Sequence, residues 1–214
     1  MIRCDDLTAF YGQAAALRAV SVAVDADEIV AVLGHNGAGK STLLNALARS
    51  HSSVQGRISL GDNDITSATP SDVARRGVSL VREGAPVFGD LSVEEHLRLG
   101  ARLAKARGRT APPFDEVWEW FDVLREKRRT KAGLLSGGQR QMLAISTALV
   151  SRPSVLLVDE PSAGLAPSMA ATVFIAMKQL CASGMSVLVA EQNLDWVTDF
   201  APRTYVLETG VLVS

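Results

Sequence analysis

The chain has 214 residues, of which 47% are hydrophobic and 21% are charged, so it is long enough for one domain with a substantial core. Its formal net charge of −1 offers no electrostatic case for binding nucleic acid, and its two cysteines lack the spacing of a metal site or a disulfide framework. The N-terminus carries charges where a signal peptide needs an apolar run, and no stretch approaches the roughly 18 apolar residues of a membrane-spanning helix. We therefore expect a cytoplasmic protein without a nucleic-acid partner.

The N-terminal part of the chain predicts strands followed by a helix. Residues 1–31 alternate apolar and polar side chains, a pattern that indicates antiparallel strands joined by turns. The nearly continuous apolar run from residue 28 to Gly34 is typical of a strand buried on both faces of a parallel sheet. Residues 41–50 then predict a helix with three leucines on one face.

A glycine-rich loop connects this buried strand to the helix. Its sequence, GHNGAGKST, matches the pattern G-x-x-x-x-G-K-[ST] in the strand–helix context that the motif requires. The backbone N–H groups of such a loop surround phosphates, Lys40 neutralises their charge, and the hydroxyl of Ser41 is placed to bind Mg²⁺. A glycine-rich turn that binds nothing is the weaker alternative. The predicted phosphate-binding residues are Gly34, His35, Asn36, Gly37, Ala38, Gly39, Lys40, Ser41 and Thr42.

The middle of the chain changes from strands to helices. Residues 56–66 predict two short strands around a turn, and residues 70–77 predict a short helix that ends at a glycine. The following segment, at about residues 91–131, is mostly helical in pattern and opens with the serine and glutamate of a capping box. Two prolines in TAPPF, residues 110–114, divide it into two predicted helices. We expect this segment to be a helical insert in an α/β core.

A second helix start suited to an anion follows this insert. In GLLSGGQRQMLAIS, residues 133–146, Ser136 and two glycines precede a run with helical periodicity. The free N–H groups at such a start can bind a phosphate. A glycine-containing cap on an ordinary helix is the alternative.

Two further stretches predict buried strands, and the first of them ends in a pair of acids. Residues 154–161, SVLLVDEP, place Asp159 at the end of an apolar run and Glu160 directly after it. The first carboxylate can hold Mg²⁺ near a phosphate, and the second can orient and deprotonate an attacking water molecule. Two solvated acids that cap the next segment are the alternative. Residues 185–193 predict another buried strand, and residues 204–214 predict a strand, a turn and an edge strand.

Together these motifs resemble the nucleotide-binding subunits of ABC transporters, and the resemblance covers essentially the whole chain. The stretch LSGGQ, residues 135–139, has the form of that family's signature. The resemblance implies a single α/β domain over residues 1–214, with a P-loop NTPase (RecA-like) core, an N-terminal antiparallel β-subdomain and an inserted α-helical subdomain. The core and β-subdomain would occupy residues 1–90 and 132–214, and the helical subdomain residues 91–131. It also implies ATPase activity with ATP and Mg²⁺.

The resemblance accounts for the presence of two phosphate-binding helix starts. In this family two subunits pair head to tail, and the signature of one covers the γ-phosphate of ATP held by the loop of the other. The signature residues carried over to this chain are Ser136, Gly137, Gly138 and Gln139. A second ATPase subunit, identical or paralogous, is therefore an implied partner.

Four other positions are compared with the family one at a time. Tyr11 stands where an aromatic residue stacks on adenine, although a half-buried strand tyrosine is a fair alternative. Glu83 replaces a glutamine that reaches Mg²⁺ and senses the membrane partner, and a solvated loop acid is the alternative. Gln192 replaces a histidine that contacts the γ-phosphate, and glutamine can donate a hydrogen bond there but carries no charge. Ala166 replaces an aspartate that makes a contact across the dimer.

These departures resemble one branch of the family. The stretches REGAPVF, SAGLAP and AEQN are similar to the ATPases of branched-chain amino acid importers and their urea and amide relatives, and the chain resembles the smaller of the two subunits. The resemblance implies solute import, transmembrane permease partners and a peripheral location on the cytoplasmic face of the membrane. A soluble ABC-type ATPase without a transporter, or a regulatory subunit with weak turnover, remains the alternative.

Overall fold

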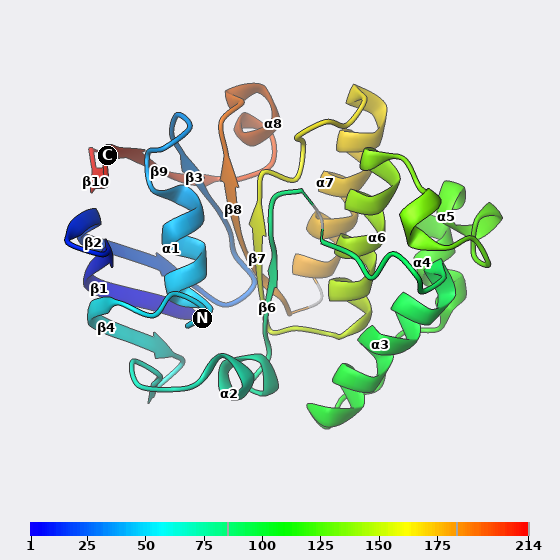
Figure 1. The fold of residues 1–214 in the computed structure, drawn as a ribbon, viewed down its shortest axis with the longest axis horizontal. Helices are drawn as coiled ribbons and strands as arrows, with labels where there is room; N and C mark the ends of the chain where they lie inside the picture. Colours follow the sequence, from blue (N-terminus) through cyan, green and yellow to red (C-terminus); the bar gives the residue numbers. More distant parts are fainter. Residues whose placement is uncertain (85, 183, 214) are drawn as a thin grey trace.

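The computed structural model describes residues 1–84, 86–182 and 184–213, and it contains two sheets with helices between and beside them (Figure 1). The first sheet is antiparallel and has the strand order β2-β1-β4-β5, as the alternating N-terminal pattern predicts. Its strands are β1 (Ile2–Tyr11), β2 (Ala14–Val24), β4 (Val54–Leu60) and β5 (Asn63–Asp64).

The second sheet has six strands in the order β10-β9-β3-β8-β7-β6. Its pairs are parallel except for the short edge strand β10, which runs antiparallel to β9. The predicted buried strands are all present in it, and Ser214 lies outside the described residues. The strands are β3 (Ile29–Leu33), β6 (Val78–Val81), β7 (Val155–Asp159), β8 (Ser186–Glu191), β9 (Arg203–Glu208) and β10 (Val211–Leu212).

The helices cover both faces of the parallel sheet. Helix α1 lies between the two sheets, α6 and α7 cover the opposite face, and α3–α5 lie beyond α6 (Figure 1). The capping box predicted before α3 is present. The helices are α1 (Lys40–Leu47), α2 (Pro70–Arg75), α3 (Val93–Ala106), α4 (Phe114–Trp120), α5 (Asp122–Glu126), α6 (Gly137–Val150), α7 (Pro167–Cys181) and α8 (Leu194–Thr198), with a 3-10 turn at Ala132–Leu134.

The prediction of two helices between residues 92 and 130 was incomplete, because the structure has three there. The break at TAPPF separates α3 from α4 as expected, but a second break lies at Phe121. The backbone of this residue is not helical, with φ −140° and ψ 76°, and its side chain is buried. The chain therefore leaves the helical path to place the Phe121 ring in the core. The limits of the insert at residues 91 and 131 stay a prediction.

Two hydrophobic cores lie on opposite faces of the parallel sheet. Alternate residues of β3 contribute to each, with Val30 and Val32 packing toward α1 and the antiparallel sheet. Ala31 and Leu33 pack into the core shared with α6, α7 and the insert. Because β3 is buried on both faces, it is apolar throughout, and the loop that follows it starts from a fixed strand.

The glycine-rich loop after β3 is also held by the turn between β9 and β10. The N–H of Gly210 donates to the carbonyl of Ala38 at 2.9 Å, and the carbonyl of Gly210 accepts from the N–H of Arg18 at 2.8 Å. A Cβ on Gly210 would lie 2.4 Å from a backbone oxygen, and one on Gly34 would lie 2.4 Å from the carbonyl oxygen of Leu207. Glycine is required at both positions because two backbone segments approach closely there.

Arg107, at the C-terminal end of α3, connects the insert to the core. Its guanidinium donates to the carbonyl oxygens of Ala74, Val78 and Ser151 at 2.9–3.0 Å. It also donates to the hydroxyls of Ser79 and Ser151 at 3.2 and 2.7 Å. Burial lowers the pKa of Arg107 to about 10. One side chain thus joins the ends of α2, α3 and α6 to the start of β6.

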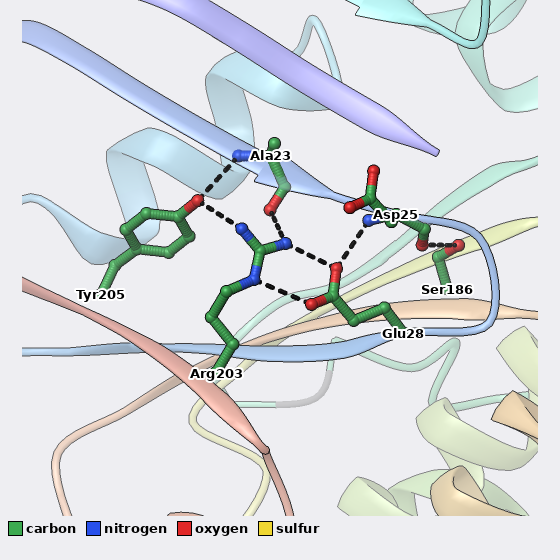
Figure 2. A network of polar contacts seen from close by, with 6 residues as sticks. All are labelled: Ala23, Asp25, Glu28, Ser186, Arg203 and Tyr205. Carbon is green, nitrogen blue, oxygen red and sulfur yellow. Dashed lines mark hydrogen bonds and ion pairs between the residues drawn. The ribbon is translucent and has the colours of Figure 1, made fainter.

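A polar network at the amino end of β3 joins both sheets (Figure 2). Arg203 of β9 donates to the Glu28 carboxylate at 2.8 Å, to the Ala23 carbonyl at 2.9 Å and to the Tyr205 hydroxyl at 2.9 Å. The Glu28 carboxylate also accepts from the N–H of Asp25 at 2.7 Å. The hydrogen bond from Arg203 lowers the pKa of Glu28.

We expect Glu28→Gln to reduce the free energy of unfolding at pH 7 by about 1 kcal/mol, because the partly exposed ion pair is screened by water. The folded protein lowers the pKa of Glu28 below its unfolded value of about 4.3, so its charge stabilises the fold above that pH. The difference between variant and wild type should shrink as the pH falls through the folded pKa. Urea unfolding at several pH values measures this, with exposed Glu208→Gln as control; a difference independent of pH would contradict the assignment.

Candidate active site

A cleft of about 430 Å³ opens beside the start of α1. It contains most of the residues predicted from the glycine-rich loop, together with Tyr11, Glu83 and Glu160, which come from three other parts of the chain. The lining residues are Tyr11, Ala16, His35, Asn36, Gly37, Gly39, Lys40, Ser41, Thr42, Glu83 and Glu160. The structure therefore brings the phosphate loop and one predicted catalytic acid to the same cleft.

Lys40 is the buried cation of this cleft, with 4% of its side chain exposed. Its ammonium donates to the carbonyls of Gly34 and His35 at 2.7 and 3.3 Å, and it lies 3.2 Å from the Glu160 carboxylate. Gly39, at φ 108°, precedes α1 without a side-chain cap. The N–H groups of the first turn are therefore left for an anion, and phosphate is the anion whose geometry suits such a loop.

Asp159, at the end of β7, carries a buried oxygen without a protein partner. The residue is 2% exposed, and its Oδ1 atom has no hydrogen bond. Burial raises the pKa of Asp159, a hydrogen bond from Ser41 lowers it, and the charges of Glu160 and Glu83 raise it further. A hard cation satisfies an unpaired carboxylate oxygen of this kind, and Ser41 supplies a second oxygen. The residues present fit Mg²⁺.

Glu160 has an unusual backbone conformation, with φ 47°. Its N–H donates to the carbonyl of Ala190 at 2.9 Å, and its own carbonyl accepts from the N–H of Ala163 at 3.1 Å. A positive φ is uncommon for a residue other than glycine, and it persists where surrounding contacts fix the turn. This turn directs the Glu160 carboxylate toward Lys40 rather than toward bulk solvent.

Tyr11 stands at the rim of the cleft, with 59% of the residue exposed. Its ring packs edge-on against His51 at a centroid distance of 4.8 Å, and its hydroxyl lies 3.5 Å from that of Thr42. His51 in turn lies 2.9 Å from the carbonyl oxygen of Phe10 through Nε2. Tyr11 is thus held by His51 and Thr42 while more than half of the residue stays exposed, which suits the stacking of a planar base.

The signature lies outside this cleft, at the start of α6. Ser136 and Gln139 form a capping box, in which each side chain accepts from the backbone N–H of the other at 3.3 and 3.1 Å. The N–H groups of Gly137 and Gly138 take no part in this cap. A Cβ on Gly138 would lie 2.8 Å from a methyl carbon of Leu165, so the second glycine is packed against the loop after Glu160.

Gln192 and its neighbour occupy different environments. Gln192 is exposed and is not among the residues that line the cleft. Sequence reasoning missed Glu191, which is 2% exposed and accepts hydrogen bonds from the backbone N–H groups of Ser162 and Gln192. The available signal was a charged residue at the end of a strand that is otherwise apolar.

Comparison with known proteins places the chain among its relatives. The family described as ABC transporter matches residues 17–163. The chain belongs to this family. It is 40% identical over 213 residues to the high-affinity branched-chain amino acid transport ATP-binding protein BraG of Pseudomonas aeruginosa, covering 100% of this chain and 91% of that protein. It is 34% identical to the probable branched-chain amino acid transport ATP-binding protein LivF of Archaeoglobus fulgidus, covering 98% of this chain and 89% of that protein.

Solved structures agree with this assignment. An ATP-binding subunit of an ABC transporter has a TM-score of 0.87 and 25% identity, over 100% of this chain and 88% of its own. The ADP conformation of another ATP-binding cassette has a TM-score of 0.83 and 27% identity, covering 100% of this chain and 89% of that chain. The protein is thus an ATP-binding ABC ATPase with the predicted α/β fold. Within the described part of the chain, no helix of this ABC ATPase has the length and apolar character to cross a membrane.

Proposed function

We propose that this ABC ATPase binds ATP with Mg²⁺ in the cleft and couples its hydrolysis to import of a branched-chain amino acid or a urea- or amide-type solute. The observation that carries the catalytic part is the meeting of Lys40 and Glu160 at 3.2 Å, with Glu160 directly following Asp159, whose buried Oδ1 atom has no hydrogen-bond partner. The names of the two relatives support a branched-chain amino acid as the solute.

The chain's own residues divide the work of hydrolysis among them. Tyr11 stacks on the adenine, and the loop amides together with Lys40 bind the phosphates. Ser41 and Asp159 would hold Mg²⁺, which supplies positive charge to the phosphates when bound. Glu160 accepts a proton from water as the water oxygen bonds to the γ-phosphorus, and the bond from that phosphorus to the bridging oxygen breaks. Glu83 lines the same cleft, from which it would face the reacting groups.

We propose that a second ATPase subunit completes each site. The N–H groups of Gly137 and Gly138, left free by the capping box, would donate to the γ-phosphate held by the opposing subunit. Gln192, which is exposed and does not line the cleft, would contact a γ-phosphate only after the two subunits close. The signature lies outside the cleft of its own subunit, which supports a role at the site of the opposing subunit. That partner would be an identical or paralogous chain.

A groove of about 360 Å³ between β6, α3 and α6 is the proposed docking site for a transmembrane permease subunit. Its lining is mostly apolar, and Phe88 at its edge is 66% exposed. Arg82 lines this groove, whereas the next residue, Glu83, lines the nucleotide cleft. This adjacency supports coupling between the docking groove and the nucleotide cleft, with the ATPase peripheral on the cytoplasmic face of the membrane.

A regulatory ATPase with weak turnover is the second candidate, favoured by the exposure of Gln192.

The test is Glu160→Gln, with ATP hydrolysis and molar mass measured in parallel. We expect turnover to fall by about a hundredfold or more, because the general base is lost, and the mass to double when ATP is added. Lys40→Ala is the matched control, which should lose ATP binding and stay monomeric. Near wild-type turnover in Glu160→Gln would contradict its catalytic role. If Glu160→Gln binds ATP but stays monomeric, the homodimer is contradicted, and the partner would be a different ATPase subunit. Wild-type phosphate release near background would favour the regulatory candidate.

A further inference from the structure

Glu191 is a buried carboxylate for which the mechanism above has no use. It ends β8 and is 2% exposed. Its Oε1 atom accepts from the N–H of Ser162 at 2.9 Å, and its Oε2 atom accepts from the N–H of Gln192 at 3.2 Å. Burying a carboxylate is costly unless its oxygens are hydrogen-bonded, and here both oxygens are used on backbone groups. The Glu191 side chain therefore fixes the backbone at two places, Ser162 and Gln192.

One of these segments is the turn that carries Glu160. Strand β8 holds this turn at two points, since the Ala190 carbonyl accepts from the N–H of Glu160 and the Glu191 side chain accepts from the N–H of Ser162. The first contact is made by backbone and is independent of side-chain identity. The second depends on the carboxylate of Glu191. Between them lies the backbone with φ 47° that aims Glu160 at Lys40.

The far end of the same turn supports the signature. The carbonyl of Ser162 accepts from the N–H of Leu165 at 3.1 Å, so the residue held by Glu191 also holds Leu165. Leu165 packs against Gly138, where a Cβ would come within 2.8 Å of its methyl carbon. Glu191 thus acts on a short segment that contacts the catalytic acid at one end and the signature helix at the other.

We propose that Glu191 is a positioning residue for ATP hydrolysis, which holds the turn of residues 160–165 in the conformation that places Glu160. This inference rests on the proposed role of Glu160 as general base. Ser162 and Gln192, the groups that Glu191 binds, do not line the cleft. A loss of positioning should therefore lower kcat and leave the affinity for ATP unchanged, whereas a merely structural role would lower stability alone.

The experiment compares Glu191→Met, which keeps the shape and removes both acceptors, with Glu191→Gln, which keeps one acceptor oxygen for Ser162. We expect Glu191→Met to lower kcat roughly ten- to hundredfold, with the Kd for ATP within about threefold of wild type. Glu191→Gln should recover most of the lost kcat. Glu191→Ala, which leaves room for water at the Ser162 N–H, gives the same expected loss of kcat if the methionine variant fails to fold.

Two controls separate positioning from stability. Ser186→Ala lies on the same strand, is equally buried and loses a hydrogen bond to the Asp25 carbonyl, so it should lower stability without changing kcat. In the double variant with Glu160→Gln, Glu191→Met should cause less than a twofold further loss, because it acts through the group already removed.

Wild-type kcat in folded Glu191→Met and Glu191→Ala would overturn the inference, as would an additive effect in the double variant. If Glu160→Gln is inactive and Glu191→Met is fully active, the inference about Glu191 is overturned and the proposed role of Glu160 stands. Near wild-type turnover in Glu160→Gln would overturn the proposed role of Glu160, and the inference with it.

Discussion

Asp159→Asn is expected to stabilise the nucleotide-free protein and to lower Mg²⁺-dependent ATP hydrolysis by about a thousandfold. Both effects come from one buried carboxylate. Without a cation, its charge is poorly solvated and one oxygen has no partner. We propose that, with Mg²⁺ and ATP bound, the same carboxylate would be a metal ligand. The substitution would therefore relieve an unfavourable buried charge in the nucleotide-free protein and remove that ligand in the loaded protein.

The pH dependence gives this prediction a second measurement. Because burial raises the pKa of Asp159 in the folded state, the folded protein binds the proton more tightly than the unfolded chain does. The contribution of this group to stability therefore rises as the pH falls from neutral through the folded pKa, and it is smallest when the group is ionised. The advantage of Asp159→Asn over wild type should shrink over the same range.

Thermal unfolding without nucleotide, and phosphate release with Mg²⁺ and ATP, test the two halves of the prediction. Asp62→Asn, on an exposed turn, is the matched control and should change neither quantity. A lower melting temperature in Asp159→Asn would contradict the assignment of an uncompensated charge. Retained hydrolysis would contradict the role of this carboxylate in holding Mg²⁺.

Arg107→Met is expected to lower the free energy of unfolding by about 3 kcal/mol, the largest stability effect among these predictions. The variant keeps most of the aliphatic volume but removes the guanidinium donor from the carbonyl groups of Ala74, Val78 and Ser151, of which Ala74 keeps the N–H of Gly77 as a donor. In a protein of this size the change corresponds to a melting temperature roughly 10 °C lower. Urea unfolding measures the free energy directly.

Arg102→Met is the matched control, because it lies on the same helix and is exposed. It should change stability by less than about 0.5 kcal/mol. If the two variants are equally stable, the guanidinium of Arg107 contributes no more to the free energy of unfolding than an exposed arginine does. A loss confined to Arg107→Met supports its role as the connection between α3 and the core.

Local patterns were sufficient to predict most elements of the fold and the phosphate loop. The strand before Gly34 is apolar because it is buried on both faces, the capping box before α3 is visible as serine followed by glutamate three residues later, and the start of α6 is visible as serine followed by two glycines. Each of these signals lies within a few residues of the feature that it predicts. The α/β class and the order of elements follow from such signals.

Features that depend on distant segments were not predicted. Glu191 and Arg107 act on backbone groups far away in the sequence, and neither residue belongs to a periodic pattern. The break at Phe121 arises because its ring is drawn into the core, which no local turn signal announces. The exposure of Gln192 depends on how the end of β8 packs against the turn of residues 160–165. Tertiary contacts decide all four, and only Glu191 leaves a trace in the sequence, as a charged residue at the end of an otherwise apolar strand.

The hydrogen bond from Gly210 to the phosphate loop bears on the order in which the protein matures on the ribosome. Ala38 leaves the ribosome early, but its carbonyl remains without this donor until the turn after β9 has been synthesised. The parallel strands β8 and β9 that flank β3 are also translated after it. Affinity for the nucleotide should therefore be acquired only after β9 and the turn that follows it have been synthesised, rather than gradually as the earlier elements emerge.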